Sequence, residues 1–452
     1  MESTPEPDRG AATSGPPALR RRDTRLDSYV DRYAARTHGM TASAIRALFA
    51  VANRPEVVSL AGGMPNIADL PLDVVGSALQ DLVLSRGLQA MQYGAGQGEQ
   101  EIREAICEVM RLEGISAHPD DVTVTVGSQQ SLDLVTRIFC DPGDVVLCEA
   151  PSYVGALGVF RSFQCEVAHV AMDEQGLVPE ALHEAVLALR AAGRSVKFVY
   201  TIPSFHNPAG VTQTLERREA VLAVAEEHDL LVIEDNPYGL LGFDTPPVPA
   251  IRARGGEDDV LYLGSFSKTF APGLRVGWVL APHAVREKLV LAAEAAVLCP
   301  PTFNQLVVAE YLSTQDWQGQ VAAFRSMYRE RRDAMLDALQ QQMPAGTTWT
   351  HPTGGFYVWV TLPGELDAKV LLPRAVTARV AFVPGTAFFA DGTGQSHLRL
   401  SYCYPEPDRI REGVRRLATV LEQEVELRST FGPTGPRRTT AAQAQAPAPD
   451  LA

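Results

Sequence analysis

The sequence has little lysine and little cysteine. Only four of its 40 basic residues are lysines, namely Lys197, Lys268, Lys288 and Lys369. Chemistry in which an amine attacks a carbonyl group therefore has four candidates. The six cysteines form no CxxC pair, and none stands at metal-ligand spacing from a histidine. We therefore expect no metal site and no disulfide framework, which suits a reducing, cytoplasmic location.

The chain also lacks long hydrophobic runs and an excess of basic residues. No run approaches the roughly 18 uninterrupted apolar residues of a membrane span, and the N-terminus holds no apolar signal core. With 54 acidic against 40 basic residues, the formal charge is −14. A nucleic acid or an anionic membrane surface needs a basic face that displaces counterions. We therefore expect neither kind of partner.

Length and local composition divide the chain into parts. At 452 residues it is too long for one modest core. Both ends are biased toward proline, glycine and polar residues, so we expect two disordered tails. Helical apolar spacing over 43–53, followed by a Gly-Gly-Met-Pro turn, predicts an arm. The expected parts are a tail (1–28), an arm packing with the small domain (29–60), a large domain (61–300), a small domain (301–430) and a second tail (431–452).

The middle of the chain alternates short apolar runs with stretches of helical spacing. This alternation predicts an α/β fold, a mostly parallel sheet covered by helices. After Pro300 the pattern changes to long helices over 304–343, then the strand GGFYVWV and a final strand and helix (HLRLSY and 408–427), which suits a smaller α+β domain. The expected strands of the large sheet are VTVTV (122–126), VVLCEA (145–150), KFVYT (197–201), LLVIED (230–235), VLYLGSF (260–266) and GWVLA (277–281).

Different polar groups follow the ends of these strands. Ligands of open α/β sheets collect at this edge, beyond the carboxyl ends of the strands. Ser128 opens a helix whose unpaired amides would hold an anion, Asn207 offers a donor, and Asp235 offers an acceptor. Taken singly, Ser128 also reads as a plain helix cap, and Asp235 as a cap of the turn before Pro237.

Lys268 differs from an ordinary loop lysine in its neighbours. Ser265, Ser267 and Arg275 place hydroxyls and a guanidinium around it, as a bound phosphate would require. Cationic neighbours and burial would lower the pKa of the lysine, which favours the neutral amine that attacks carbonyls. An amine, an anion cradle and a lone carboxylate together indicate a phosphorylated aldehyde cofactor.

Seven motifs then resemble one family over about residues 30–428. They are SLAGGMPN, MQYGAGQG, GSQQSLDLV, YTIPSFHNPAG, EDNPY, SFSKTFAPGLRVGW and VPGTAFF…HLRLSY. In this order they resemble the fold-type I pyridoxal-phosphate aminotransferases of class I/II, most of all the branch of the 2-aminoadipate and kynurenine aminotransferases. The resemblance implies a three-layer αβα large domain, a smaller α+β domain, pyridoxal 5'-phosphate and a homodimer.

The same resemblance implies a role for each matching residue. Lys268 looks like the lysine of the internal aldimine and Asp235 like the carboxylate that keeps the pyridine nitrogen protonated, with Tyr238 as the third catalytic residue. Tyr238 and Asn207 match residues that bond the phenolic oxygen, and Tyr153 matches the aromatic stacked on the ring. The implied phosphate site comprises Ser128, Gln129, Ser265, Ser267, Arg275 and, from the neighbouring subunit, Tyr93; the implied substrate site comprises Arg399, Asn207 and Gly63.

Arg399 and three departures from the family pattern need separate mention. On pattern alone Arg399 lies on one strand face with His397 and Ser401, which is also typical of a solvated face, whereas the resemblance implies a clamp for the substrate carboxylate. His206 stands where relatives commonly have Gln, and Asn236 and Leu240 replace acidic residues. His206 would tune the ring, touch substrate or pack behind the site. These departures bear on substrate identity.

We therefore expect an aminotransferase that moves the amino group of an L-amino acid to a 2-oxo acid by a ping-pong mechanism. An alternative keeps the cofactor but performs a lyase, replacement or annulation reaction of a specialised pathway. A third reading is a ligand-sensing module like the regulator-fused relatives. Only about 30 residues precede the resemblance here, too few for their DNA-binding segment.

Overall fold

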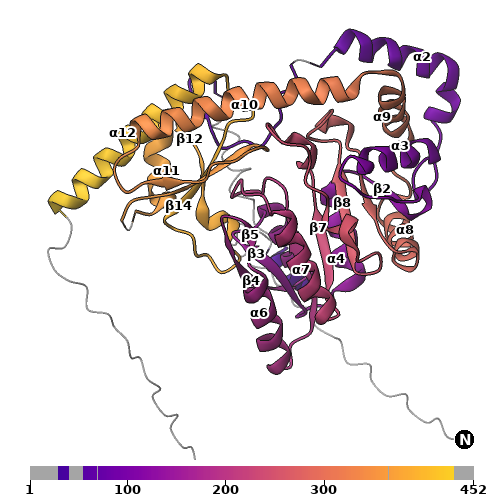
Figure 1. Cartoon of the computed structure of the whole chain (residues 1–452), viewed down its shortest axis with the longest axis horizontal. Helices are drawn as coiled ribbons and strands as arrows, with labels where there is room; N and C mark the ends of the chain where they lie inside the picture. Colours follow the sequence, from indigo (N-terminus) through magenta and orange to yellow (C-terminus); the bar gives the residue numbers. More distant parts are fainter. Residues whose placement is uncertain (1–28, 40–53, 69, 365, 432–452) are drawn as a thin grey trace, which may run out of the picture.

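An eight-stranded, mostly parallel sheet lies at the centre of the molecule (Figure 1). The computed structural model describes residues 29–39, 54–68, 70–364 and 366–431. Strands β8, β7, β6, β3 and β4 run parallel, while β9 and β5 are antiparallel to their neighbours. In spatial order the strands are β2 (Val122–Thr125), β9 (Gly277–Leu280), β8 (Val260–Ser265), β7 (Leu231–Asp235), β6 (Val196–Thr201), β3 (Val145–Ala150), β4 (Glu166–Asp173) and β5 (Gly176–Leu177).

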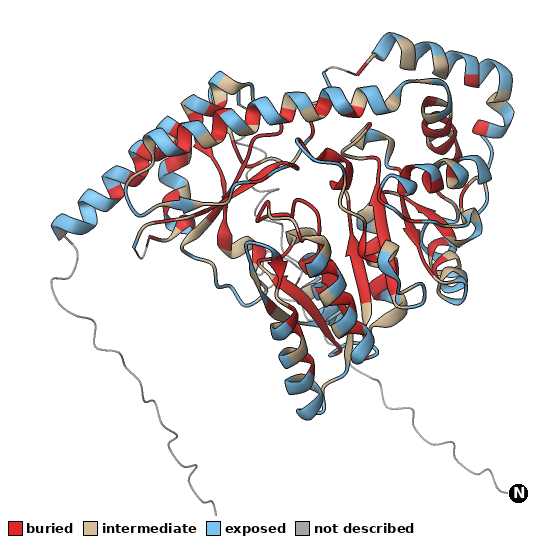
Figure 2. Ribbon diagram, viewed as in Figure 1, coloured by how far each residue is buried: buried red, intermediate tan, exposed pale blue. Residues whose placement is uncertain are grey.

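Helices cover both faces of this sheet, and each inner strand is therefore buried on both sides (Figure 2). One face is covered by α4 (Ser128–Phe139), α5 (Val154–Ser162) and α8 (His283–Val297), which pack on it through Leu132, Phe160 and Leu289. The other face is covered by α6 (Pro179–Ala191) and α7 (Leu215–Glu227), which pack on it through Leu182 and Val221. Burial on two faces explains why these strands read as continuous apolar runs in the sequence.

A second, antiparallel sheet is built from the C-terminal part of the chain. Its order is β10 (Thr348–Trp349), β11 (Tyr357–Thr361), β14 (His397–Ser401) and β13 (Val383–Pro384). Strand β1 (Val58–Ser59) pairs in parallel with β12 (Val380–Ala381), which ties the start of the described core to this region. The remaining α-helices are α2 (Leu72–Ala90), α3 (Gln100–Arg111), α9 (Thr302–Thr314), α10 (Trp317–Gln342), α11 (Ala368–Thr377) and α12 (Pro407–Phe431).

The expected α/β architecture with a small second sheet is confirmed, and the predicted strands of the large sheet agree with the observed ones to within one residue. The stretch 304–343 is two helices, α9 and α10, because residues 315–316 leave the helical conformation. The expected tails (1–28 and 431–452, apart from Phe431 itself) and the helix over 43–53 lie outside the described residues. Within the described part, no helix is both long enough and apolar enough to cross a bilayer.

Candidate active site

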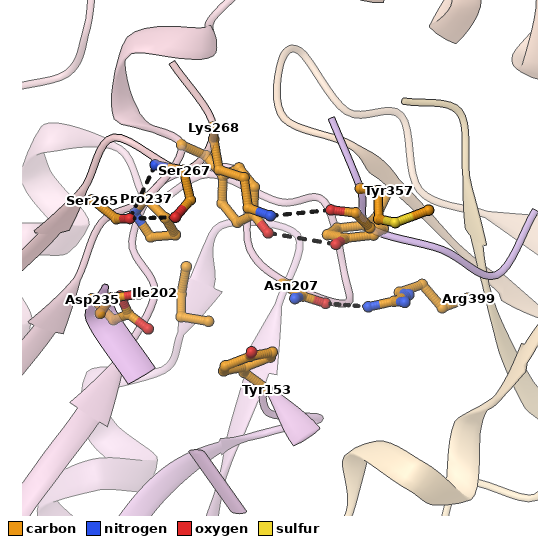
Figure 3. A pocket seen from close by; sticks show the side chains of 14 residues that line it. Tyr153, Ile202, Asn207, Asp235, Pro237, Ser265, Ser267, Lys268, Tyr357 and Arg399 are labelled. Carbon is orange, nitrogen blue, oxygen red and sulfur yellow. Dashed lines mark hydrogen bonds between the residues drawn. The ribbon is translucent and has the colours of Figure 1, made fainter. Parts of the chain in front are cut away.

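A cavity lies where the carboxyl ends of β6, β7 and β8 face the small sheet (Figure 3). Both sheets supply its walls, with Lys268 and Asp235 on the large-sheet side and Arg399 and Tyr357 on the small-sheet side. Its lining residues are Gly63, Met64, Ser128, Tyr153, Ile202, Asn207, Asp235, Pro237, Tyr238, Ser265, Ser267, Lys268, Tyr357 and Arg399. The cavity thus brings together ten of the thirteen site residues predicted from the sequence.

Lys268 follows β8 and points into this cavity (Figure 3). Its Nζ donates a hydrogen bond to the backbone oxygen of Gly63 at 3.0 Å. Burial lowers the pKa of Lys268 to about 8, and the positive charges of Arg399 and Arg275 act in the same direction. A far larger fraction of this amine is therefore neutral near pH 7 than of a free lysine.

Asp235 ends β7 with one oxygen bonded and the other free. Oδ2 accepts a hydrogen bond from the Tyr200 hydroxyl at 2.7 Å, whereas buried Oδ1 has no partner among the described residues. Burial raises the pKa of Asp235 to about 6, although the bond from Tyr200 opposes this. An unpartnered buried acceptor costs free energy, so this geometry suits a cationic N–H donor placed in the cavity.

The residues of the predicted anion cradle lie close together where β8, α4 and the turn at Arg275 meet. Ser265 Oγ donates to Ser267 Oγ at 2.9 Å, and Arg275 Nη1 donates to Ser267 Oγ at 3.4 Å. Gly127 has φ +77°, and a Cβ there would collide with the Arg275 guanidinium. This glycine therefore lets the guanidinium lie against the start of α4, beside Ser128 at the helix N-terminus.

Arg399 is buried in the middle of β14, with only 1% of its surface exposed. Its Nη1 donates to Asn207 Oδ1 at 2.7 Å and its Nη2 to the backbone oxygen of Ala61 at 2.8 Å. The guanidinium also stacks 4.1 Å from the centre of the Tyr357 ring. The solvated-face interpretation is therefore wrong, because aromatic side chains of the small sheet cover that face.

Three predicted residues lie outside the lining. Gln129 is exposed and reaches the site only through Tyr153, whose hydroxyl donates to Gln129 Oε1 at 3.3 Å. Arg275 is exposed and contacts the cradle through Ser267. Tyr93 is 76% exposed and does not line the cavity of its own chain.

Sequence reasoning missed Tyr357, which touches three other parts of the site. Its hydroxyl accepts from that of Tyr238 at 3.5 Å, and a Cβ on Gly63 would collide with it. The available signal was the alternation in GGFYVWV, since β11 pairs with β14 and places Tyr357 opposite Ser401 and Trp359 opposite Arg399. Without that pairing, nothing in the sequence connects Tyr357 to Arg399.

His206 packs behind the site and does not line the cavity. Its Nε2 lies 3.0 Å from Glu149 Oε2, and its Nδ1 accepts from the Ala209 amide at 3.2 Å. Burial alone would raise the pKa of Glu149, but the charge of His206 and hydrogen bonds, including one from the Ile202 amide, lower it. This buried pair anchors the loop that carries Asn207 to the end of β3.

The other two departures are also accommodated away from the cavity. Asn236 Nδ2 donates to Glu113 Oε1 at 2.6 Å, and Tyr262 donates to the other oxygen of Glu113 at 2.6 Å. Leu240 is buried in the apolar core. An acidic residue at 236 would face Glu113 directly, so the asparagine matches its surroundings.

Comparisons with known proteins agree with this geometry. A family model described as Aminotransferase class I and II matches residues 55–417. Aromatic-amino-acid aminotransferase 1 of Thermococcus litoralis is 40% identical over 399 residues, covering 88% of this chain and 95% of that protein. The structure of kynurenine aminotransferase from Pyrococcus horikoshii in complex with PMP has a TM-score of 0.84 at 38% identity. The match covers 88% of this chain and 99% of that one. LysN, the alpha-aminoadipate aminotransferase of Thermus thermophilus, complexed with N-(5'-phosphopyridoxyl)-L-leucine, has a TM-score of 0.82 at 37% identity, covering 88% and 100%.

A half-buried lysine and a buried carboxylate at the edge of a mostly parallel sheet, together with these matches, define the class: the chain belongs to the aminotransferase class I and II family. It is a pyridoxal-phosphate-dependent transaminase, similar to the 2-aminoadipate and kynurenine aminotransferases. The expected family, fold, cofactor and reaction are thereby confirmed. The lyase, replacement or annulation alternative receives no support from these matches.

Proposed function

We propose that the cavity binds pyridoxal phosphate and an aromatic L-amino acid side by side, with Lys268, Asp235 and Arg399 carrying the chemistry. The observation that carries this proposal is the free Asp235 Oδ1 in the same cavity as a lysine amine of lowered pKa. The carboxylate oxygen would accept a hydrogen bond from the protonated ring nitrogen of the cofactor, and the amine would react with its aldehyde. Ser128, Ser265 and Ser267 would hold the phosphate, with Gln129 and Arg275 supporting them from outside the cavity.

Each side chain then has a distinct task. When bound, pyridoxal phosphate supplies the aldehyde that takes up nitrogen and a ring that accepts the electron pair of the Cα–H bond. Lys268 Nζ would hold the cofactor and, once released, would remove and return the proton at Cα. Asp235 Oδ1 would accept a hydrogen bond from the ring nitrogen, and Tyr153 would pack on the ring. Tyr238 and Asn207 would donate to the phenolic oxygen.

On the substrate side, Arg399 presents a planar fork to the α-carboxylate, as only arginine can. Asn207 Oδ1 already accepts from this guanidinium at 2.7 Å and keeps it oriented. Gly63, the third residue of the proposed substrate site, lacks a side chain and so leaves room for the Tyr357 hydroxyl at the cavity wall. Its carbonyl oxygen accepts from Lys268 Nζ. The Nε of Arg399 has no partner among the described residues, so we expect a bound carboxylate to accept from it while Asn207 remains in contact.

The aromatic donor is inferred from the lining of the cavity. Among the described residues that form it, Lys268 and Arg399 are the only cationic side chains, and both already have tasks. A second carboxylate, as in 2-aminoadipate, would find no arginine there. Tyr357, Met64 and Ile202 instead offer aromatic and apolar surface. The aromatic-amino-acid and kynurenine aminotransferases among the relatives agree with such a donor.

A donor and acceptor screen tests this proposal. Purified enzyme with bound cofactor is mixed with single amino acids, and the cofactor absorbance is followed without acceptor. A ping-pong mechanism predicts a full change of the cofactor spectrum with the donor alone. Adding a 2-oxo acid should then restore the original spectrum. Phenylalanine, tyrosine or kynurenine should give higher kcat/KM than 2-aminoadipate or glutamate. Equal or better kcat/KM for the dicarboxylic donors would overturn the aromatic assignment.

We also propose that the enzyme is a homodimer in which Tyr93 reaches the phosphate of the neighbouring site. The exposed apolar side chains of α2 and the following turn support this, among them Leu84, Leu88 and Tyr93 at 76, 94 and 76% exposure. Mixed dimers of Lys268→Ala and Tyr93→Ala chains test it, because one of their two sites would be intact. Activity that does not exceed the sum of the separate variants contradicts the shared site.

We further propose a cytoplasmic location and a division of the chain into two domains. None of the six cysteines, all of which the structure describes, forms a disulfide, which supports a cytoplasmic location. The two separate sheets support a cofactor-binding domain over 61–300 and a smaller domain over 301–430. Limited proteolysis with mass mapping would test that division.

A further inference from the structure

Two histidines and a glutamate meet on the helices that cover the sheet face opposite α4, α5 and α8. His183 lies in α6, Glu227 is the last residue of α7, and His228 follows it. One donor atom of each lies within 4.8 Å of the others. His183 and His228 are far apart in the sequence, so no spacing motif marks the cluster, and the expectation of no metal site rested on cysteine and histidine spacing alone.

Two of the three distances in this cluster are close to those of a metal coordination sphere. Zinc bonds of about 2.0–2.1 Å in a tetrahedron put neighbouring ligand atoms about 3.3 Å apart. His183 Nδ1 lies 3.0 Å from His228 Nε2 and 3.6 Å from Glu227 Oε2. Two of the three distances are therefore within a few tenths of an ångström of tetrahedral spacing. The third, between His228 and Glu227, is at most 4.8 Å, and rotation of the exposed Glu227 side chain can shorten it.

The surroundings hold the two imidazoles in place but leave one side open. Leu182, next to His183, is fully buried in the core beneath the helices, and His228 is only 7% exposed. The Nη2 of Arg190, a cation beside the cluster, donates to the backbone oxygen of His228 at 2.6 Å. The Glu227 side chain is 60% exposed, so a water molecule can complete the coordination.

We propose that His183, Glu227 and His228 form a binding site for a divalent transition-metal ion such as Zn²⁺, with water as the fourth ligand. Two imidazoles and one carboxylate suit zinc, nickel or cobalt rather than calcium or magnesium. Binding requires that the proton now shared between the two rings leave that contact, which a shift to the other nitrogen of one imidazole accomplishes.

The position of the site predicts what the metal does. It joins α6 to the end of α7, which precedes the start of β7. Asp235 lies at the other end of that strand. A metal here cross-links two helices that pack on the same sheet face, and it stabilises the folded state by mass action. It does not touch the transamination site, so turnover should not require it.

The test uses the holoenzyme, stripped with a chelator and titrated with ZnCl₂ or CoCl₂. One ion should bind per chain, raise the thermal unfolding midpoint and, as Co²⁺, give the visible absorption of tetrahedral coordination. Zn²⁺ should also protect His183 against diethyl pyrocarbonate, mapped by mass spectrometry. His183→Ala and Glu227→Gln should each weaken binding about tenfold or more, equivalent to about 1.4 kcal/mol, while leaving the circular dichroism spectrum and kcat unchanged.

His283→Ala is the matched control. His283 also has a carboxylate 3.6 Å away, from Glu287, but its neighbour is Arg286 instead of a second imidazole. This variant should bind the ion like the parent, and Zn²⁺ should leave His283 open to modification. Absence of binding overturns the proposal. Binding that survives both His183→Ala and Glu227→Gln also overturns it, because the ion is then held by thiols or by the cofactor.

Discussion

The two walls of the active-site cavity differ in how completely the protein satisfies its own polar groups. On the large-sheet wall, Asp235 keeps an oxygen without a partner and Lys268 is an amine of lowered pKa held by one carbonyl oxygen. On the small-sheet wall, both terminal nitrogens of Arg399 have protein acceptors and Tyr357 covers its face, so that of its guanidinium only Nε lacks a partner among the described residues. The first wall is electrostatically incomplete, because it leaves a carboxylate oxygen unpaired, and the second is preorganised, because it holds its guanidinium in place.

The difference agrees with the occupants that we propose for the two walls. A cofactor with a fixed positive ring nitrogen and a phosphate can compensate for buried groups that would otherwise cost free energy. A substrate that enters and leaves in every turnover gains more from a guanidinium that is already oriented. Removing groups from the first wall should therefore affect catalysis, and changing the second should affect mainly KM.

The largest expected effect comes from the amine on the incomplete wall. Lys268→Ala should lower kcat by about 10⁴-fold, because no other described lining residue supplies a base for the Cα proton. Single-turnover absorbance measurements check this. Fold and cofactor retention are checked by circular dichroism and phosphate content. Residual activity within tenfold of the parent would show that the comparison of the walls is mistaken.

Asp235→Asn should have the next largest effect. The amide has nearly the same shape but no charge, so it leaves the ring nitrogen without its counter-ion. Breaking a buried ion pair costs about 3 kcal/mol or more, which is about 10²-fold in kcat. Steady-state kinetics with saturating cofactor measure the loss. An unchanged kcat would mean that Oδ1 is not facing the ring nitrogen.

The same carboxyl group predicts a pH dependence of the cofactor-free protein. Burial raises the pKa of Asp235 from 3.8 to about 6, so between these values the folded state binds more protons than the unfolded state. Its stability should therefore fall as pH rises through this range, by up to about 3 kcal/mol. Denaturant unfolding of the parent and Asp235→Asn at several pH values gives the difference. Glu113, whose pKa burial raises to about 7, is present in both chains and cancels. A difference independent of pH contradicts the prediction.

Local patterns in the sequence predict the large-sheet wall, whereas Arg399 on the other wall was predicted as a carboxylate clamp only through the family resemblance. Lys268, Asp235 and Asn207 follow apolar runs, and parallel strands bring their carboxyl ends to one edge, so periodicity alone places these residues together. Arg399 reaches the cavity only because β14 pairs with β11, and its stacking partner Tyr357 depends on that pairing. Antiparallel register between distant segments leaves no local signal.

Contacts behind the site are still less visible in the sequence. His206 drew notice only because relatives commonly have Gln at that position, and its partner Glu149 lies at the end of another strand. The pairing of Asn236 with Glu113 is equally hidden. Such contacts depend on which strands are neighbours, which the order along the chain does not state.

Arg399→Lys tests the preorganised wall. Lysine keeps the charge but loses the fork and the stacking on Tyr357, so kcat/KM should fall about thirtyfold, mainly through KM, as expected for one lost charge-assisted hydrogen bond. Binding of a substrate-like carboxylate, followed by the cofactor absorbance, should weaken to the same extent. A fall confined to kcat would place Arg399 with the catalytic groups of the other wall.

The smallest expected effect concerns His206, which connects the two walls through the Asn207 loop. Its contact with Glu149 fixes that loop to β3, and Asn207 in turn orients Arg399. His206→Gln retains a donor toward Glu149 and should leave KM nearly unchanged. His206→Ala leaves the Glu149 charge without this neighbour and loosens the loop, so KM should rise about threefold, the value of one ordinary hydrogen bond. If both variants change kcat and spare KM, His206 acts on the cofactor instead, and the substrate wall is not held through this loop.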